Sequence, residues 1–89
     1  MTTVAAPKVK EFDQNSLEKI AYTAVASIPT REPNDQYRLG YNVWMFLKER
    51  KGTLELAVKN SGARILVSDS EALDTIRKEL KNSGIDLLP

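Results

Sequence analysis

Histidine and cysteine are both absent from the 89 residues of this chain, and their absence removes several kinds of chemistry. Without cysteine there are no disulfides, thiolate zinc sites or thiol nucleophiles. Without histidine, a general base near neutral pH would have to be a shifted carboxylate or lysine, and no sequence feature marks one. The sequence also lacks a Gly-x-Ser-x-Gly elbow and a glycine-rich phosphate loop. We therefore expect a protein that is not an enzyme and that uses no cofactor or small-molecule substrate.

Acidic residues gather in one place only, at Asp69, Glu71 and Asp74. Carboxylate oxygens at this spacing could bind a hard cation. The more ordinary interpretation is that they are the first-turn acids of a helix, where the helix macrodipole stabilises negative charge. We favour that interpretation and expect no metal site.

Long apolar runs are absent as well. The longest run of large apolar side chains covers residues 43–47, whereas a membrane-spanning helix needs about 20 apolar residues. The first eleven residues contain no continuous apolar segment of the kind found in signal peptides. We expect a cytoplasmic protein without a membrane partner.

Glycine and proline are scarce, with four of each, while 42% of the residues are apolar and 28% are charged. This composition is typical of a globular chain rather than a disordered one. A chain of this length hides only about 60–65% of its unfolded surface, so it can build one modest core. We expect one domain over residues 13–89, preceded by a flexible arm over residues 1–12 that adds a short edge strand at residues 9–12.

The net charge of +1 conceals an uneven distribution along the chain. Residues 36–68 carry six basic and two acidic side chains, a net charge of +4. Residues 1–35 carry a net charge of −1 and residues 69–89 a net charge of −2. The middle of the chain is therefore basic, and its two ends are mildly acidic.

The first segment with helical periodicity has apolar residues at positions 17, 20, 21, 24, 25 and 28. Pro29 cannot continue the hydrogen-bond ladder, so the helix ends there. Its start has two candidate N-caps: Asp13, or Asn15 with Glu18 at capping-box spacing.

The second such segment lies near the end of the chain. Ser68 or Ser70 caps it, and its apolar stripe comprises positions 72, 73, 76 and 80. Gly84 suits the position just after a helix, with Ile85 folding back onto the last turn. Both ends of the domain are therefore predicted to be helical.

The segment at residues 37–51 is compatible with two structures. As a helix it would be capped by Asp35 and ended by Gly52, with an apolar stripe at positions 39, 43, 46 and 47. As a strand it would place the large apolar side chains at odd positions 39–47 on one face. Its aromatic and β-branched residues favour a strand, and Gly40 would weaken a helix interior by about 0.5–1 kcal/mol. We favour the strand.

Two further runs favour a sheet. Residues 53–59 alternate between apolar and polar side chains, and residues 64–68 are rich in strand-forming types. Residues 50–52 and 60–62 each end in a glycine that can take a positive φ, as three-residue hairpin loops require. The sequence therefore predicts an α+β domain with the order helix, three-stranded antiparallel meander, helix. The alternative is a small all-α domain.

The sequence Lys-Asn-Ser-Gly occurs twice, at residues 59–62 and 81–84. A duplication would imply matching structures at the two places. The strand assignment puts the first copy in a hairpin and the second at a helix end. The repeat is therefore either coincidental or a sign against the strands. We favour coincidence because the match covers only four residues.

The predicted order of elements resembles in outline the double-stranded RNA-binding domain. The last helix of that family opens with a basic cluster that grips phosphates, and Asp69, Ser70 and Glu71 stand at the corresponding place here. The resemblance therefore extends to topology and implies no RNA-binding residues.

On the predicted first strand, one face would pack under the helices and the other would expose Trp44 and Phe46 among basic residues. Aromatic and arginine side chains are common anchors of protein interfaces. They also bind the bases and phosphates of nucleic acids. A third interpretation places Trp44 and Phe46 in the core.

The near-neutral total charge favours a protein partner, which could be a second copy of this chain. We expect a non-catalytic regulatory or adaptor module, with nucleic-acid binding through the same surface as the alternative. The candidate partner-binding residues are Arg38, Asn42, Trp44, Phe46, Lys48, Arg50, Lys51, Lys59 and Arg64.

Overall fold

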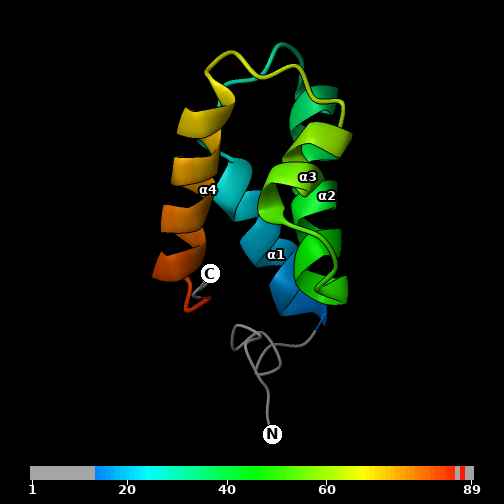
Figure 1. Ribbon diagram of the computed structural model, residues 1–89, viewed down its shortest axis with the longest axis vertical. Helices are drawn as coiled ribbons and strands as arrows, with labels where there is room; N and C mark the ends of the chain where they lie inside the picture. Colours follow the sequence, from blue (N-terminus) through cyan, green and yellow to red (C-terminus); the bar gives the residue numbers. More distant parts are fainter. Residues whose placement is uncertain (1–13, 86, 88–89) are drawn as a thin grey trace, which may run out of the picture.

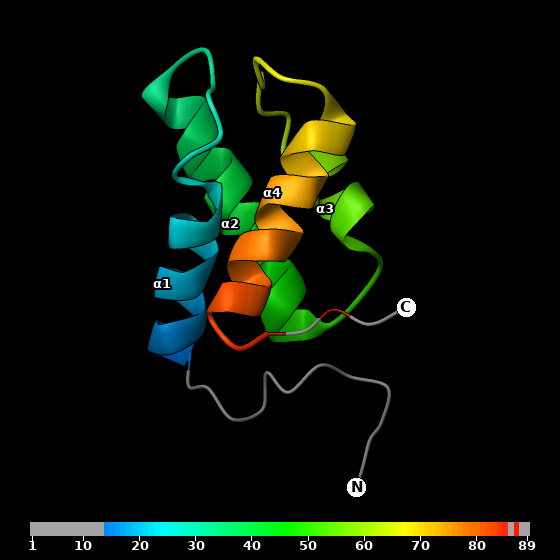
Figure 2. The same ribbon diagram turned by 90° about the vertical axis from the view of Figure 1, so that its left-hand side faces the viewer.

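The computed structural model describes residues 14–85 and residue 87, and this part of the chain forms four helices. Helix α1 (Gln14–Val25) is followed by α2 (Pro33–Glu49), the short α3 (Leu54–Asn60) and α4 (Asp69–Asn82), which run alternately up and down (Figure 1). Helix α1 packs against α2 and α4, and α2 also packs against α3, whereas α3 touches α4 only lightly. The α1–α2 and α3–α4 loops lie side by side at one end of the molecule (Figure 2).

The predicted α+β fold is wrong. Among the described residues, β pairing is limited to one isolated antiparallel bridge between Thr30 and Ile65, so there is no meander. The all-helical alternative describes the architecture. The topological resemblance to the double-stranded RNA-binding domain disappears with the meander.

The strand predicted at residues 37–51 is replaced by most of α2. Pro33 occupies the first turn, where its missing N–H costs nothing, and the Asp35 carboxylate accepts the backbone N–H of Glu32 at 3.1 Å. The stripe that faces the core consists of positions four residues apart, a helical period. Its members are the fully buried Leu39, Val43 and Leu47.

Gly40, which argued against a helix, lies where α1 approaches α2. A Cβ atom at this position would lie 2.6 Å from Cε1 of Tyr22, so only glycine admits the tyrosine ring against the α2 backbone. The same ring stacks on Tyr37, with centroids 5.6 Å apart. Close packing between two helices therefore outweighs the intrinsic helix penalty of this glycine, about 0.5–1 kcal/mol.

The strand predicted at residues 53–59 is also wrong, because these residues form α3 and its N-cap. The Thr53 hydroxyl accepts the backbone N–H of Leu56 at 3.1 Å. Leu54 and Val58, four residues apart, are buried, whereas Leu56, which strand alternation places with them, is half exposed.

The strand predicted at residues 64–68 is a loop that pairs with the α1–α2 loop. The backbone N–H of Leu66 donates to the Pro29 carbonyl at 2.9 Å, and that of Arg31 donates to the Arg64 carbonyl at 3.0 Å. These two bonds tie together connections that lie about thirty-five residues apart in the sequence. The strand-forming residues at 64–68 therefore pair with another loop and not with a strand of a sheet.

The two Lys-Asn-Ser-Gly copies have the same structure, which the hairpin assignment did not allow. Each one ends a helix, with Ser61 and Ser83 as C-cap residues. Gly62 and Gly84 follow with φ of 70° and 96°, in the left-handed region that glycine adopts without strain. The repeat was a sign against the strands.

The last helix is confirmed. The Ser68 hydroxyl accepts the backbone N–H of Glu71 at 3.1 Å, which makes Ser68 the N-cap. Ile85 folds back as predicted: its N–H donates to the Leu80 carbonyl at 2.8 Å and its side chain is fully buried.

The first helix is confirmed as well, but it ends at Val25, four residues before Pro29. Asn15 lies inside α1, so its predicted role as N-cap is wrong. Asp13, the other predicted cap, and the arm and edge strand predicted over residues 1–12 lie outside the described residues.

A single core fills the space where α1, α2 and α4 meet, and α3 and the C-terminal turn add to it. No helix in the described part of the chain is long and apolar enough to cross a membrane. The buried apolar residues are Leu17, Ala21, Ala24, Val25, Ile28, Leu39, Val43, Leu47, Leu54, Val58, Ala72, Ile76, Leu80 and Ile85.

Candidate functional site

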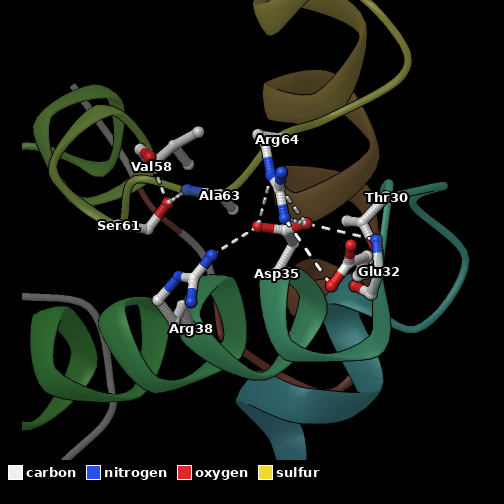
Figure 3. A network of polar contacts seen from close by, with 8 residues as sticks. All are labelled: Thr30, Glu32, Asp35, Arg38, Val58, Ser61, Ala63 and Arg64. Carbon is white, nitrogen blue, oxygen red and sulfur yellow. Dashed lines mark hydrogen bonds and ion pairs between the residues drawn. The ribbon is translucent and has the colours of Figure 1, made fainter.

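Two polar arrangements outside the core are candidates for function, and the first surrounds the fully buried Asp35 (Figure 3). Its carboxylate accepts from Arg38 on the same helix at 2.5 Å and from Arg64 on the α3–α4 loop at 3.2 Å. It also accepts the backbone N–H of Glu32. The Glu32 carboxylate lies 3.8 Å from Arg64 at the edge of the group.

This network holds the fold and leaves Asp35 without a chemical role. Burial alone would raise the pKa of the Asp35 carboxyl, but hydrogen bonds from Arg64 and the charges of Arg64 and Arg38 outweigh burial and lower it. Both carboxylate oxygens already accept hydrogen bonds. An ionised and fully bonded carboxylate is a poor general base, so the network serves to pin the α3–α4 loop to α2.

The second arrangement surrounds a hollow of about 530 Å³ between the end of α2, the start of α3 and the side of α4. It exists because α3 packs on α2 and only lightly on α4. Its volume lies within the range of about 300–1,000 Å³ that is typical of ligand pockets. The residues that line it are Phe46, Arg50, Gly52, Thr53, Leu54, Glu55, Arg77 and Leu87.

Arg50 is the unusual residue of this hollow. Its Nε and Nη1 atoms are buried and have no hydrogen-bond partner in the described structure. Its guanidinium lies over the Phe46 ring, with Cζ 5.1 Å from the ring centroid. Burial lowers the pKa of Arg50, although an arginine stays charged at neutral pH.

The other cation of the hollow already has partners. Arg77 on α4 donates to the Glu55 carboxylate on α3 at 2.5 Å and lies 3.8 Å from Asp74. The pKa of Glu55 is lowered by its own backbone N–H, although burial opposes this, and by the charge of Arg77. The pair spans the gap between α3 and α4, and in the described part of the chain it leaves Arg50 as the unpaired charge in the lining of the hollow.

A second hollow, of about 300 Å³, is lined by residues of α2, the α2–α3 turn and α3. The two hollows share Phe46, Gly52 and Thr53 in their linings. Met45 and the half-exposed Leu56 add apolar surface to the second hollow, and Lys51 lies at it. We call the two hollows together the α2–α3 groove.

The nine predicted binding residues do not share one face, because successive residues of a helix point about 100° apart. Phe46 and Arg50, one turn apart, meet at the larger hollow, and Asn42 and Lys51 line the smaller one. The Asn42 side chain also donates to the Ala57 carbonyl on α3 at 3.0 Å.

The remaining predicted residues lie elsewhere. Arg38 and Arg64 belong to the Asp35 network, while Lys48 and Lys59 are exposed. Trp44 is partly buried and meets Tyr41 edge-on, with ring centroids 5.9 Å apart. Trp44 and Phe46 both pack against the core, as the third interpretation of the sequence held, but neither is fully buried.

Sequence reasoning missed Glu55, Leu56 and Arg77. The Glu55–Arg77 pair joins residues 22 positions apart on two helices, so no local sequence pattern indicates it. A helical interpretation of residues 37–51 would have placed Phe46 and Arg50 on the same side one turn apart, which was the available signal.

Comparison of the chain with models of protein families, with curated proteins and with solved structures finds no match.

Proposed function

We propose that this protein is a non-catalytic binding module that holds a segment of a protein partner in the α2–α3 groove. The observation that carries the proposal is the place of Phe46, which lines both hollows. Two hollows that share an aromatic side chain suit a chain segment that places one side chain in each.

The residue types of the groove support a protein partner. Aromatic, methionine and arginine side chains are enriched in protein interfaces, and Phe46, Met45 and Arg50 supply one of each. Leu56 exposes half of its surface at the smaller hollow. Contact with an apolar side chain of a partner would remove this apolar surface from water and so favour binding.

Nucleic-acid binding is the weaker candidate, because two of the six basic side chains in the middle of the chain are held by carboxylates. Arg38 and Arg64 pair with Asp35, and Arg64 also lies near Glu32. Phosphate binding draws its affinity from cations that are free to replace counterions. Lys48, Lys51 and Lys59 remain exposed, but they are few.

The test is selection of random peptides displayed on phage against the immobilised full-length chain. Selected peptides are then measured with Leu56→Lys, which places a charge in the groove, and with Leu66→Lys as the matched control. Leu56 and Leu66 are both exposed, at 50% and 62%, but Leu66 lies on the α3–α4 loop. We expect Leu56→Lys to weaken binding about tenfold or more, a loss of about 1.4 kcal/mol, and Leu66→Lys to leave it unchanged.

The proposal fails if no peptide is selected, or if both variants bind the selected peptides as wild type does. Binding to duplex DNA, duplex RNA or single strands, with affinity that falls steeply with salt, would point to the nucleic-acid alternative. Self-association that Leu56→Lys abolishes would identify the partner as a second copy of this chain.

A further inference from the structure

We infer that the larger hollow receives a carboxylate group of the partner segment, with the Arg50 guanidinium as its counter-ion. This inference rests on the proposed function and names the chemistry that the segment must carry. It predicts a segment in which an aspartate or glutamate side chain stands beside an apolar residue.

The first support is that Arg50 is costly to the isolated fold. A buried donor without an acceptor destabilises a protein by about 1–3 kcal/mol, and more when it is charged. Two nitrogen atoms of Arg50 are in this condition within the described structure. These two atoms are covered by protein atoms, so a carboxylate in the hollow would act on the guanidinium through its charge.

The second support is the backbone of the same residue. Arg50 is the C-cap of α2 and has φ 58° and ψ 36°. It is the one residue other than glycine with a positive φ in the described part of the chain. Glycine usually takes this position, because the left-handed conformation costs other residues about 1–2 kcal/mol. Backbone strain and unpaired charge thus coincide at one side chain, and such coincidence is typical of functional sites.

The side chain is also held in place before any ligand arrives. The guanidinium contacts the Phe46 ring, and the backbone N–H of Arg50 donates to the Phe46 carbonyl at 2.8 Å, which anchors the base of the side chain at the end of α2. A cation that is already positioned loses little conformational entropy on binding.

The charges around the hollow favour a ligand group with a single negative charge. Arg77 is paired with Glu55, so among the described residues Arg50 is the unpaired cation of the lining, and Glu55 stands on the same lining. A dianionic phosphate would be repelled by Glu55, and the described lining offers it no second unpaired cation. The walls provided by Phe46, Leu54 and Leu87 suit an apolar stem beside the carboxylate.

The test uses four probes that share a phenyl ring but differ in charge: phenylacetate, phenyl phosphate, benzylamine and benzyl alcohol. Each is titrated into the full-length chain and followed by heteronuclear NMR. We expect saturable binding of phenylacetate with a dissociation constant of the order of millimolar, and at least about tenfold weaker binding of the other three.

Arg50→Met and Arg50→Gly remove the cation in two ways, and the glycine variant suits the left-handed backbone should the methionine variant fold poorly. Arg31→Met removes an exposed arginine at the other end of the molecule and serves as the matched control. Both Arg50 variants should lose phenylacetate binding about tenfold or more, while Arg31→Met should keep it.

Equal binding of all four probes, binding that survives in both Arg50 variants, or no phenylacetate binding at all would overturn the inference. Peptides that bind through Leu56 without needing an acidic residue would leave the proposed function standing and defeat the inference alone. Phenylacetate binding at Arg50 without any selected peptide would support a carboxylate site at Arg50 and defeat the proposed function.

Discussion

The guanidinium of Arg50 lies over the ring of Phe46 one helical turn earlier, with Cζ 5.1 Å from the ring centroid, at the point where α2 ends. This contact supplies about 0.5–1 kcal/mol at a partly exposed site. It does not offset both the left-handed backbone of Arg50 and its buried, unpaired nitrogen atoms. The isolated fold therefore gains no net stability from the Arg50 side chain.

Replacement of Arg50 by glycine should leave the fold equally stable or stabilise it by up to about 1 kcal/mol. The substitution relieves backbone strain of about 1–2 kcal/mol and removes the unpaired charge, against the lost contact with Phe46. Urea denaturation of the two proteins measures the difference. A loss of more than about 1 kcal/mol in Arg50→Gly would mean that Arg50 serves the fold.

Gly40→Ala should destabilise the protein by about 1–3 kcal/mol, although alanine is the better helix former by about 0.5–1 kcal/mol. The reason is the ring of Tyr22, which occupies the space of the new Cβ atom. The matched experiment makes the same change in a Tyr22→Ala background, where the space is open. There Gly40→Ala should be neutral or stabilising, and an equal loss in both backgrounds would show that the ring is not the cause.

Asp35 should make stability depend on pH in acid. Its pKa is lowered in the folded state, so its contribution is present above the unfolded value of about 3.9 and is lost as the pH falls through the folded value. Urea midpoints should therefore fall below about pH 4, and Glu55, whose pKa is also lowered, adds to the same fall. In Asp35→Asn the fall should be smaller, because less ionised carboxylate remains to be protonated. If the urea midpoint of Asp35→Asn falls with pH as steeply as that of the wild type, Asp35 is not held by the arginines.

Gln36 should matter for the end of α1. Its Nε2 donates to the carbonyls of Val25, Ala26 and Ile28 at 3.0 to 3.1 Å, at and just after the last residue of α1, where carbonyls lack i+4 helical donors. Gln36→Ala should cost about 1 kcal/mol. Gln36→Glu should cost more, because a carboxylate would face three carbonyl oxygens. Thermal denaturation near neutral pH ranks the wild type and the two variants by stability. A glutamate variant as stable as the wild type would contradict the capping role.

The two terminal helices could be predicted because one interpretation satisfied every local signal. In α4, the N-cap Ser68, the buried stripe and the left-handed Gly84 all agree with a helix. Residues 37–51 satisfied two periods at once, since positions 39, 43 and 47 belong to both the alternating and the helical pattern. Long-range packing decided between them: Tyr22 needs Gly40, and no local rule reports that need.

The candidate site could be predicted only in part. Phe46 and Arg50 were named from their types, but the hollow depends on how α3 and α4 diverge, which the sequence does not show. Arg38 and Arg64 were assigned to binding because they are basic, and the Asp35 carboxylate that holds both lies 29 residues from Arg64. The repeated Lys-Asn-Ser-Gly sequence was the signal set aside as coincidence, although two matching helix ends would have removed the hairpin.

The most direct test of the central claim follows the Nε–Hε resonance of Arg50 in the full-length protein as a selected acidic peptide is added. We predict a saturable shift of this resonance with the same dissociation constant as the backbone signals of the α2–α3 groove. The same peptide with glutamine or asparagine in place of its acid should leave the resonance where it is. A peptide that binds the groove while the Arg50 resonance stays unchanged, or that moves it equally after the acid is removed, would contradict the account.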